Sequence, residues 1–311
     1  MTDQSLSSSP ASSDAGSPPA LNPPLEAIPP VFTIETVLGC NLHCPACAIG
    51  GGMVMRKHGR LTFERYQIVA EKIRPYCRYF YLHLWGEPLL NIEIYDIIRH
   101  ASQYSQTNIS TNAVTLNDEK AEKLITSGVT DVIVSIDGMS QDVYERYRAG
   151  GKVDRALSGL MMLQKYNLAH GTPVAIMPQY ILFKHNQHEA AQFAQFCADI
   201  GLRATFKAPY LRKTEGLEYS DIPGFRRQHH ENQADRLEAM KTCQNGWNVF
   251  TIHLDGSVVA CCYDHNRETY FGNIFEQSVE EIWNSPAYTR FRYRLRTGHA
   301  ERFCVDQCLL Y

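Results

Sequence analysis

Segments with the pattern of β-strands alternate with helical segments through the first two thirds of this chain. Strands are expected at Val31–Leu38, Tyr79–Trp85, Thr107–Ser110, Asp131–Ile136, Val174–Phe183 and Arg203–Lys207. Helices are expected at Thr62–Arg74, Ile92–Gln106, Asp118–Ser127, Val153–Lys165 and Gln187–Ile200. Consecutive strands joined by helices pair in parallel through right-handed crossovers. The alternation therefore predicts an α/β fold, either a doubly wound sheet or a barrel.

Single residues mark some of these boundaries. Asn117 is a suitable N-cap for the helix at Asp118–Ser127, because its side-chain oxygen can accept from a free backbone N–H. Gly128 and Gly201 stand where the chain leaves a helix, a position that favours glycine.

Three cysteines follow the first predicted strand within eight residues. Cys40, Cys44 and Cys47 supply three close thiolates, which can bind three irons of a cubane cluster and leave the fourth iron for a small molecule. A structural zinc site is an alternative, but its fourth ligand would have to be a residue such as His43, poorly placed between two ligands. The remaining alternative is that the three cysteines are unrelated thiols of the protein core.

The CxxxCxxC spacing of these cysteines resembles that of the radical S-adenosylmethionine (radical SAM) family. The resemblance implies that the cluster's unique iron binds the amino and carboxylate groups of SAM. Reductive cleavage of SAM would give a 5′-deoxyadenosyl radical that abstracts a substrate hydrogen. The resemblance also favours a partial, six-stranded (β/α)6 TIM-like barrel over a doubly wound sheet, with functional loops at the C-terminal ends of the strands.

The second strand ends in Trp85-Gly-Glu-Pro, which resembles the family's Gly-Gly-Glu motif with Trp85 in place of the first glycine. The resemblance implies that Gly86 and Glu87 hold the SAM amino group. Gly86 would let the backbone approach a ligand, and Glu87 would supply an anion for the ammonium group. The alternative is an ordinary turn before Pro88 with a solvated glutamate.

Polar residues also end the third and fourth strands. The resemblance implies that Ser135 and Arg148 bind the SAM carboxylate and that Asn112 or Asp137 lies nearer the ribose. A capping role for Ser135 and a surface ion pair for Arg148 are the alternatives. Ala46 stands where the family often has an aromatic residue near adenine, so the adenine contact is expected elsewhere.

A second set of cysteines occupies the last seventy residues: Cys243, Cys261, Cys262, Cys304 and Cys308. The run Leu254-Asp-Gly-Ser predicts a hairpin that brings Cys243 close to Cys261. The pattern resembles the SPASM/Twitch domain of radical SAM enzymes. The resemblance implies one auxiliary 4Fe–4S cluster, bound by Cys243, Cys261, Cys304 and Cys308, because a full SPASM domain with two clusters needs more cysteines. A zinc ribbon, or Cys262 in place of one ligand, stays open.

Composition divides the chain further. Residues 1–30 are rich in Ser and Pro and are expected to form a disordered tail without a peptide-recognition domain. The barrel is expected over 31–210, a linker and helix over 211–242, and the auxiliary-cluster domain over 243–311. The net charge of −3 gives no argument for nucleic acid or an anionic membrane as partner. No apolar run approaches the ~20 residues of a membrane span.

Together these features predict a radical SAM oxidoreductase in the reducing cytoplasm, with flavodoxin or ferredoxin as a suitable electron donor. An auxiliary cluster that accepts an electron fits oxidation of a sugar or cyclitol, or modification or crosslinking of a peptide. A radical epimerase with Cys262 as hydrogen-atom donor is the alternative reaction, although Cys262 also fits a spare thiol. An iron–sulfur or zinc protein without catalysis is the alternative of another class.

Overall fold

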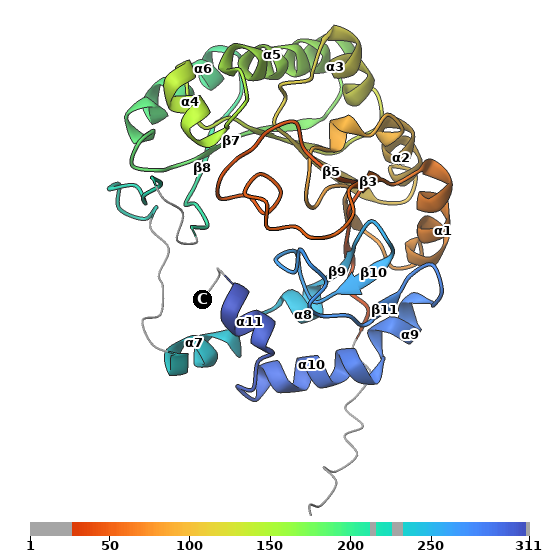
Figure 1. The fold of residues 1–311 in the computed structure, drawn as a ribbon. Helices are drawn as coiled ribbons and strands as arrows, with labels where there is room; N and C mark the ends of the chain where they lie inside the picture. The colour runs from red at the N-terminus through yellow and green to blue at the C-terminus, as the bar shows by residue number, and fades with distance from the viewer. Residues whose placement is uncertain (1–26, 212–215, 226–232, 309–311) are drawn as a thin grey trace, which may run out of the picture.

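The computed structural model of the chain describes residues 27–211, 216–225 and 233–308. The predicted tail therefore falls largely outside the described residues, as does the basic run 226–230 of the predicted linker. Figure 1 shows a curved sheet with helices on its outer side.

Six parallel strands follow one another in the sheet and confirm the predicted partial barrel. They are β1 (Val31–Ile34), β4 (Tyr79–Tyr81), β5 (Gln106–Thr111), β6 (Asp131–Ser135), β7 (Ala175–Ile181) and β8 (Thr205–Lys207). A separate pair, β2 (Val37–Leu38) with β3 (Gly59–Arg60), is antiparallel and closes the loop that carries Cys40, Cys44 and Cys47. This loop lies inside the curve of the barrel (Figure 1).

Amphipathic helices cover the outer side of the sheet. They are α1 (Phe63–Ile73), α2 (Ile94–Ala101), α3 (Asp118–Ile125), α4 (Gln141–Tyr147), α5 (Val153–His170) and α6 (Ala190–Asp199), with short 3-10 turns η1 (Pro88–Leu90) and η2 (Gln187–Glu189). Asn117 caps α3 as predicted, accepting from the Lys120 N–H at 2.9 Å. The short helix α4 was not predicted, and Ile92–Gln106 contains a helix only over its middle part.

The C-terminal unit joins the barrel sheet, which the sequence did not indicate. Its first strand, β9 (Val249–Ile252), pairs in parallel with β1, and the predicted hairpin continues through β10 (Ser257–Val259) to β11 (Gly272–Asn273). The remaining elements are α7 (Gln233–Met240), α8 (Asn245–Asn248), α9 (Val279–Trp283), α10 (Pro286–Arg296) and α11 (Arg302–Gln307). The two cysteine-bearing regions are therefore parts of one nine-stranded sheet.

Alternate side chains of the barrel strands face in opposite directions. Phe80, Ile109 and Val132 are buried in the core under the helices, whereas Tyr81 and His83 on the other face are only half-buried. In a closed barrel the inward side chains fill the interior in packed layers. Here Tyr81 and His83 keep part of their surface accessible to solvent, so the inner face is not fully packed.

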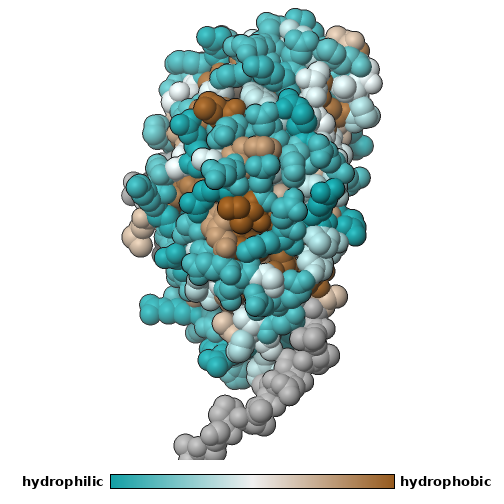
Figure 2. All heavy atoms as spheres, turned by 90° about the vertical axis from the view of Figure 1, so that its right-hand side faces the viewer, coloured by the Kyte–Doolittle hydropathy of each residue, from teal (hydrophilic) through white to brown (hydrophobic). Residues whose placement is uncertain are grey.

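The outer surface carries scattered apolar groups. Figure 2 shows small hydrophobic areas on a mainly hydrophilic face, and isolated apolar groups of this kind are normal for protein surfaces. Among the described residues, none of the helices combines the length and the apolar character that crossing a membrane requires.

Candidate functional site

The loop after β2 brings Cys40, Cys44 and Cys47 together. The Cys47 N–H donates to the Cys44 carbonyl at 3.0 Å, and the Cys40 sulfur accepts the Leu42 N–H at 3.4 Å. Burial raises the pKa of Cys44 to about 12, and the neighbouring thiols add to that rise while Arg148 opposes it. Thiols in such surroundings become thiolates only beside strong positive charge, which the irons of a cluster supply. The three residues therefore fit a 4Fe–4S cluster.

Glycines allow this loop to fold back on itself. A Cβ at Gly50 would lie 2.3 Å from the Cys44 nitrogen, so no other residue fits there. The Gly51 N–H donates to the Cys47 carbonyl at 2.7 Å. The sequence pattern had not singled out Gly50 as part of the site.

An apolar shell surrounds the loop and was also missed. It contains Leu42, Cys44, Tyr147, Phe183 and Leu217, which come from four separate parts of the chain. The Tyr147 and Phe183 rings lie 4.6 Å apart. Such a shell keeps water from the site and lowers its dielectric constant, which protects a radical and tunes a cluster.

Glu87 is almost completely buried beside the loop. Its Oε1 accepts from the Thr111 hydroxyl at 2.7 Å and the Leu89 N–H at 3.2 Å, and its Oε2 accepts from the Asn112 N–H at 2.8 Å. Burial raises the pKa of Glu87, while these donors oppose the rise. A carboxylate has about four acceptor positions, so one remains for the predicted SAM ammonium group.

Gly86 serves a packing role as well as the predicted approach to a ligand. Its φ is +102°, and a Cβ there would lie 2.6 Å from the Gly39 carbonyl oxygen and 2.7 Å from that of Val37. The Glu87 N–H donates to the same Gly39 carbonyl at 2.9 Å. The motif therefore holds the start of the cysteine loop directly.

Asn112 also contacts the loop. Its Nδ2 donates to the Asn41 side chain at 2.9 Å and lies 3.8 Å from the Cys40 sulfur. Ser135 lies at the end of β6 with little exposure. Both stay predicted SAM contacts that the geometry permits.

Asp137 and Arg148 form an ion pair rather than two separate ligand contacts. Asp137 is fully buried; its Oδ2 accepts from Arg148 Nε at 2.5 Å and its Oδ1 from the Ile181 N–H at 2.5 Å. The Arg148 guanidinium lies 4.0 Å from the Cys44 sulfur. Asp137 therefore fits the orientation of Arg148 better than the predicted ribose contact, and the surface position considered for Arg148 is wrong.

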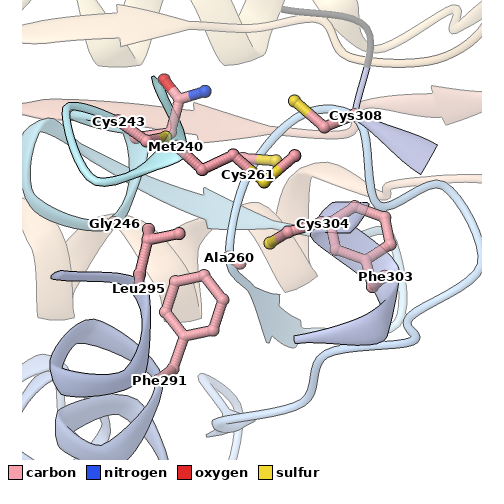
Figure 3. A pocket seen from close by; sticks show the side chains of 11 residues that line it. Met240, Cys243, Gly246, Ala260, Cys261, Phe291, Leu295, Phe303, Cys304 and Cys308 are labelled. Carbon is pink, nitrogen blue, oxygen red and sulfur yellow. The ribbon is translucent and has the colours of Figure 1, made fainter. Parts of the chain in front are cut away.

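The four predicted auxiliary ligands line one apolar pocket, with Met240, Ala260, Phe291, Leu295 and Phe303 among its other walls. Figure 3 shows Cys243, Cys261, Cys304 and Cys308 around the same space. All ten cysteines of the chain are free. Burial, together with the thiols of Cys308 and Cys243, raises the pKa of Cys304 to about 12. The donor set and its dry surroundings fit an iron–sulfur cluster.

Cys262 lies outside this pocket. The Cys262 residue keeps solvent-exposed surface. The protein around its thiol is nevertheless dense enough to raise the pKa of Cys262 by desolvation. Burial, Asp131 and the Cys262 thiol together raise the pKa of Tyr81 on the barrel's inner face. Cys261 therefore lines the auxiliary pocket, while its neighbour Cys262 is close enough to the inner face of the barrel to act on Tyr81.

Arg56 connects the two cysteine-bearing regions and was not recognised in the sequence. Its guanidinium donates to both oxygens of the fully buried Glu35 at 2.8 Å, and its Nε donates to the His265 carbonyl at 2.6 Å. The Asn266 side chain binds the backbone of the segment that contains Arg56. The Trp85 and His265 rings lie 5.8 Å apart. These contacts hold the segment after Cys261 against the barrel.

The arrangement of the cysteine side chains differs from that of a site that binds one metal ion. Within residues 27–211, 216–225 and 233–308, no three His, Cys, Asp or Glu side chains are placed to hold one metal ion. In a cubane each thiolate binds a different iron, so the ligands stand further apart than around one zinc ion.

Two family models match this chain. One, described as the radical SAM superfamily, matches residues 34–197, and the other, described as an iron–sulfur cluster-binding domain and named SPASM, matches residues 243–309. The first covers most of the barrel, and the second covers the four cysteines of the auxiliary pocket. Together they account for both sets of cysteines.

Several known proteins are similar to this chain over most of its length. The chain is 24% identical over 306 residues to an AdoMet-dependent heme synthase of Methanosarcina barkeri, covering 85% of each chain. It is 26% identical over 291 residues to the mycofactocin maturase MftC of Mycobacterium tuberculosis, covering 84% of this chain and 72% of the relative. The structure of BtrN in complex with AdoMet and 2-DOIA superposes with a TM-score of 0.54 at 18% identity, over 88% of this chain and 89% of that one.

Proposed function

This chain belongs to the radical SAM superfamily, and we propose that it oxidises an alcohol group of its substrate through a 5′-deoxyadenosyl radical. It is a radical SAM enzyme whose cofactors are a SAM-binding 4Fe–4S cluster, SAM and an auxiliary iron–sulfur cluster. Reductive cleavage of SAM at the first cluster supplies the radical once these groups are bound. The alternative prediction, an iron–sulfur or zinc protein without catalysis, does not agree with this family assignment.

Different residues of the chain have separate roles in this reaction. Cys40, Cys44 and Cys47 hold the first cluster, and Glu87 binds the SAM ammonium group beside it. The apolar shell around the loop excludes water from the radical. Arg148 places a positive charge near Cys44, where it fits the SAM carboxylate or the charge of the cluster.

One observation supports oxidation in particular. Cys261 lines the auxiliary pocket, and the neighbouring Cys262 acts electrostatically on Tyr81, which lies on the inner face of the barrel. An electron acceptor near this face suits a reaction in which the substrate radical loses an electron. Small-molecule binding beside AdoMet is supported by the BtrN complex, and a peptide substrate by the structure of Streptococcus suis SuiB bound to the precursor peptide SuiA.

Anaerobic reconstitution tests the proposal. We expect about eight irons per chain, from two 4Fe–4S clusters, and formation of 5′-deoxyadenosine with SAM and either dithionite or a reduced flavodoxin or ferredoxin. Incubation with pooled sugars, cyclitols and peptides should give a product lighter by two hydrogens. A variant with Cys40, Cys44 and Cys47 all changed to Ala should keep roughly half the iron and make no 5′-deoxyadenosine. Iron content equal to that of the wild type would show that these residues hold no cluster.

The exposed position of Cys262 favours one second candidate, radical epimerisation. A thiol facing the substrate donates a hydrogen atom that has exchanged with solvent. In deuterated water an epimerase would place deuterium on an inverted carbon, and Cys262→Ala would stop the reaction after hydrogen abstraction. An oxidised product without solvent deuterium, formed equally well by Cys262→Ala, supports oxidation. The predicted location, a reducing cytoplasm, would keep these thiols free.

A further inference from the structure

Four polar side chains form a continuous hydrogen-bonded series on the inner face of the barrel, apart from the cofactor residues. The series runs from Asp131 on β6 through Tyr79 on β4 and Asn108 on β5 to His83, which follows β4. Tyr79 hydroxyl binds Asp131 Oδ2, Asn108 binds the Tyr79 oxygen, and His83 Nε2 lies 2.9 Å from Asn108 Oδ1. Three of the strands thus contribute to one chain of contacts.

The carboxylate at one end fixes the direction of every bond in this series. A carboxylate only accepts, so the Tyr79 hydroxyl donates to Asp131. The Tyr79 oxygen then accepts from Asn108 Nδ2, in agreement with the lowering effect of this bond on the Tyr79 pKa. The Asn108 carbonyl oxygen therefore faces the imidazole and accepts a hydrogen bond from it. His83 Nε2 must carry the proton of this bond. His83 Nδ1 therefore holds the lone pair.

That lone pair has no partner among the residues that the structure describes. No group there bonds His83 Nδ1, and the atom is not among the fully buried polar atoms that lack a partner, so it keeps some accessible surface on the inner face of the barrel. The Tyr81 ring meets the imidazole edge-on, with centroids 5.7 Å apart. Cys262 is close enough to Tyr81 to raise the pKa of that phenol.

The imidazole is neutral at physiological pH. Desolvation lowers the pKa of His83 to about 4, and the Lys207 ammonium on β8 lowers it as well, while the bond to Asn108 opposes both. The other titratable groups that face this region are Tyr79, Tyr81 and Asp131 on the barrel and Cys262 on the auxiliary unit. A neutral imidazole with a fixed tautomer and an open nitrogen can accept a proton, and its pKa of about 4 makes it a weaker base than an ordinary histidine.

We propose that His83 Nδ1 accepts the hydroxyl proton of the substrate during its oxidation, with Asn108 as the residue that fixes the tautomer. This inference rests on the proposed alcohol oxidation. Conversion of a carbinol to a carbonyl removes one hydrogen atom, one proton and one electron. The hydrogen atom from carbon forms the new C–H bond of 5′-deoxyadenosine, the O–H bond breaks toward His83, and an oxidised iron–sulfur cluster is the class of electron acceptor.

The tautomer is measurable without a substrate. In the reconstituted enzyme with ¹⁵N-labelled histidine, we expect one imidazole to be protonated at Nε2 and unprotonated at Nδ1 from pH 8 down to about pH 5, and to be absent from the spectrum of His83→Gln. Asn108→Leu should mix the tautomers, whereas Asn108→Asp keeps an acceptor and should preserve the Nε2–H form. A proton on Nδ1, or a charged His83 at pH 7, would overturn the assignment.

Product formation tests the base itself. His83→Gln places a side-chain amide near Asn108 but offers no base, so the variant should still form 5′-deoxyadenosine while the oxidised product falls by about 10²–10⁴-fold. Iron content and SAM binding serve as controls and should not change. An unchanged rate of oxidation in His83→Gln refutes the base. If the wild type oxidises no alcohol, the proposed function fails and the role of His83 fails with it, whatever the tautomer.

Discussion

Replacement of Arg56 by Met should destabilise the protein strongly, because it leaves a buried carboxylate without its partner. Glu35 has no exposed surface and uses both oxygens on Arg56; one of them also accepts the Leu254 N–H at 3.0 Å. Removal of one partner of a buried ion pair costs about 3–5 kcal/mol. The bond from Arg56 to the His265 carbonyl is lost as well, at about 1 kcal/mol.

Urea denaturation of the reconstituted protein measures this change. With a slope of about 3 kcal/mol per molar urea, the combined loss of about 4–6 kcal/mol corresponds to a midpoint lower by roughly 1.3–2 M. Arg56→Lys keeps the charge and should lose less. In a double variant of Arg56→Met with Glu35→Gln, no charge is left buried, so the second substitution should restore part of the stability.

The loss should also depend on pH. Burial already raises the pKa of Glu35 against the opposing effect of Arg56, and removal of the cation raises it further. A group whose pKa is higher in the folded state takes up a proton on folding, so the variant loses stability as pH rises through that range. A stability change below 1 kcal/mol, or one that shrinks as pH rises from 5 to 8, would refute this account of the ion pair.

Three further substitutions probe the two cofactor regions. Gly86→Ala should prevent assembly of the first cluster, measured as iron content and absorbance, because its Cβ would overlap the Gly39 carbonyl. Glu87→Gln should keep the cluster and weaken SAM binding roughly ten- to a hundredfold, the value of a charge-assisted hydrogen bond; unchanged affinity would contradict the contact. Arg292→Met should reduce the iron held by the auxiliary pocket, because Arg292 donates to the Gly246 carbonyl in the pocket wall at 2.8 Å, and full iron content would show that this support is dispensable.

The local chemistry of the chain determined much of the fold and of the first cluster site. Cys40, Cys44 and Cys47 are close in sequence, so their spacing alone predicted a shared metal centre. The N-cap at Asn117 and the alternation of strands and helices are also set by neighbouring residues, and both were confirmed. Such features depend on interactions within a few residues, which a sequence displays directly.

Contacts between distant segments were decided by the tertiary structure alone. The pairing of β9 with β1, the ion pair of Arg56 with Glu35 and the use of Asp137 by Arg148 each join residues that no sequence pattern links. His83 looked like an ordinary strand residue, because its role depends on Asn108 and Asp131 on the next two strands. Burial gives these contacts their energy, and burial is a property of the assembled sheet rather than of any segment of the chain.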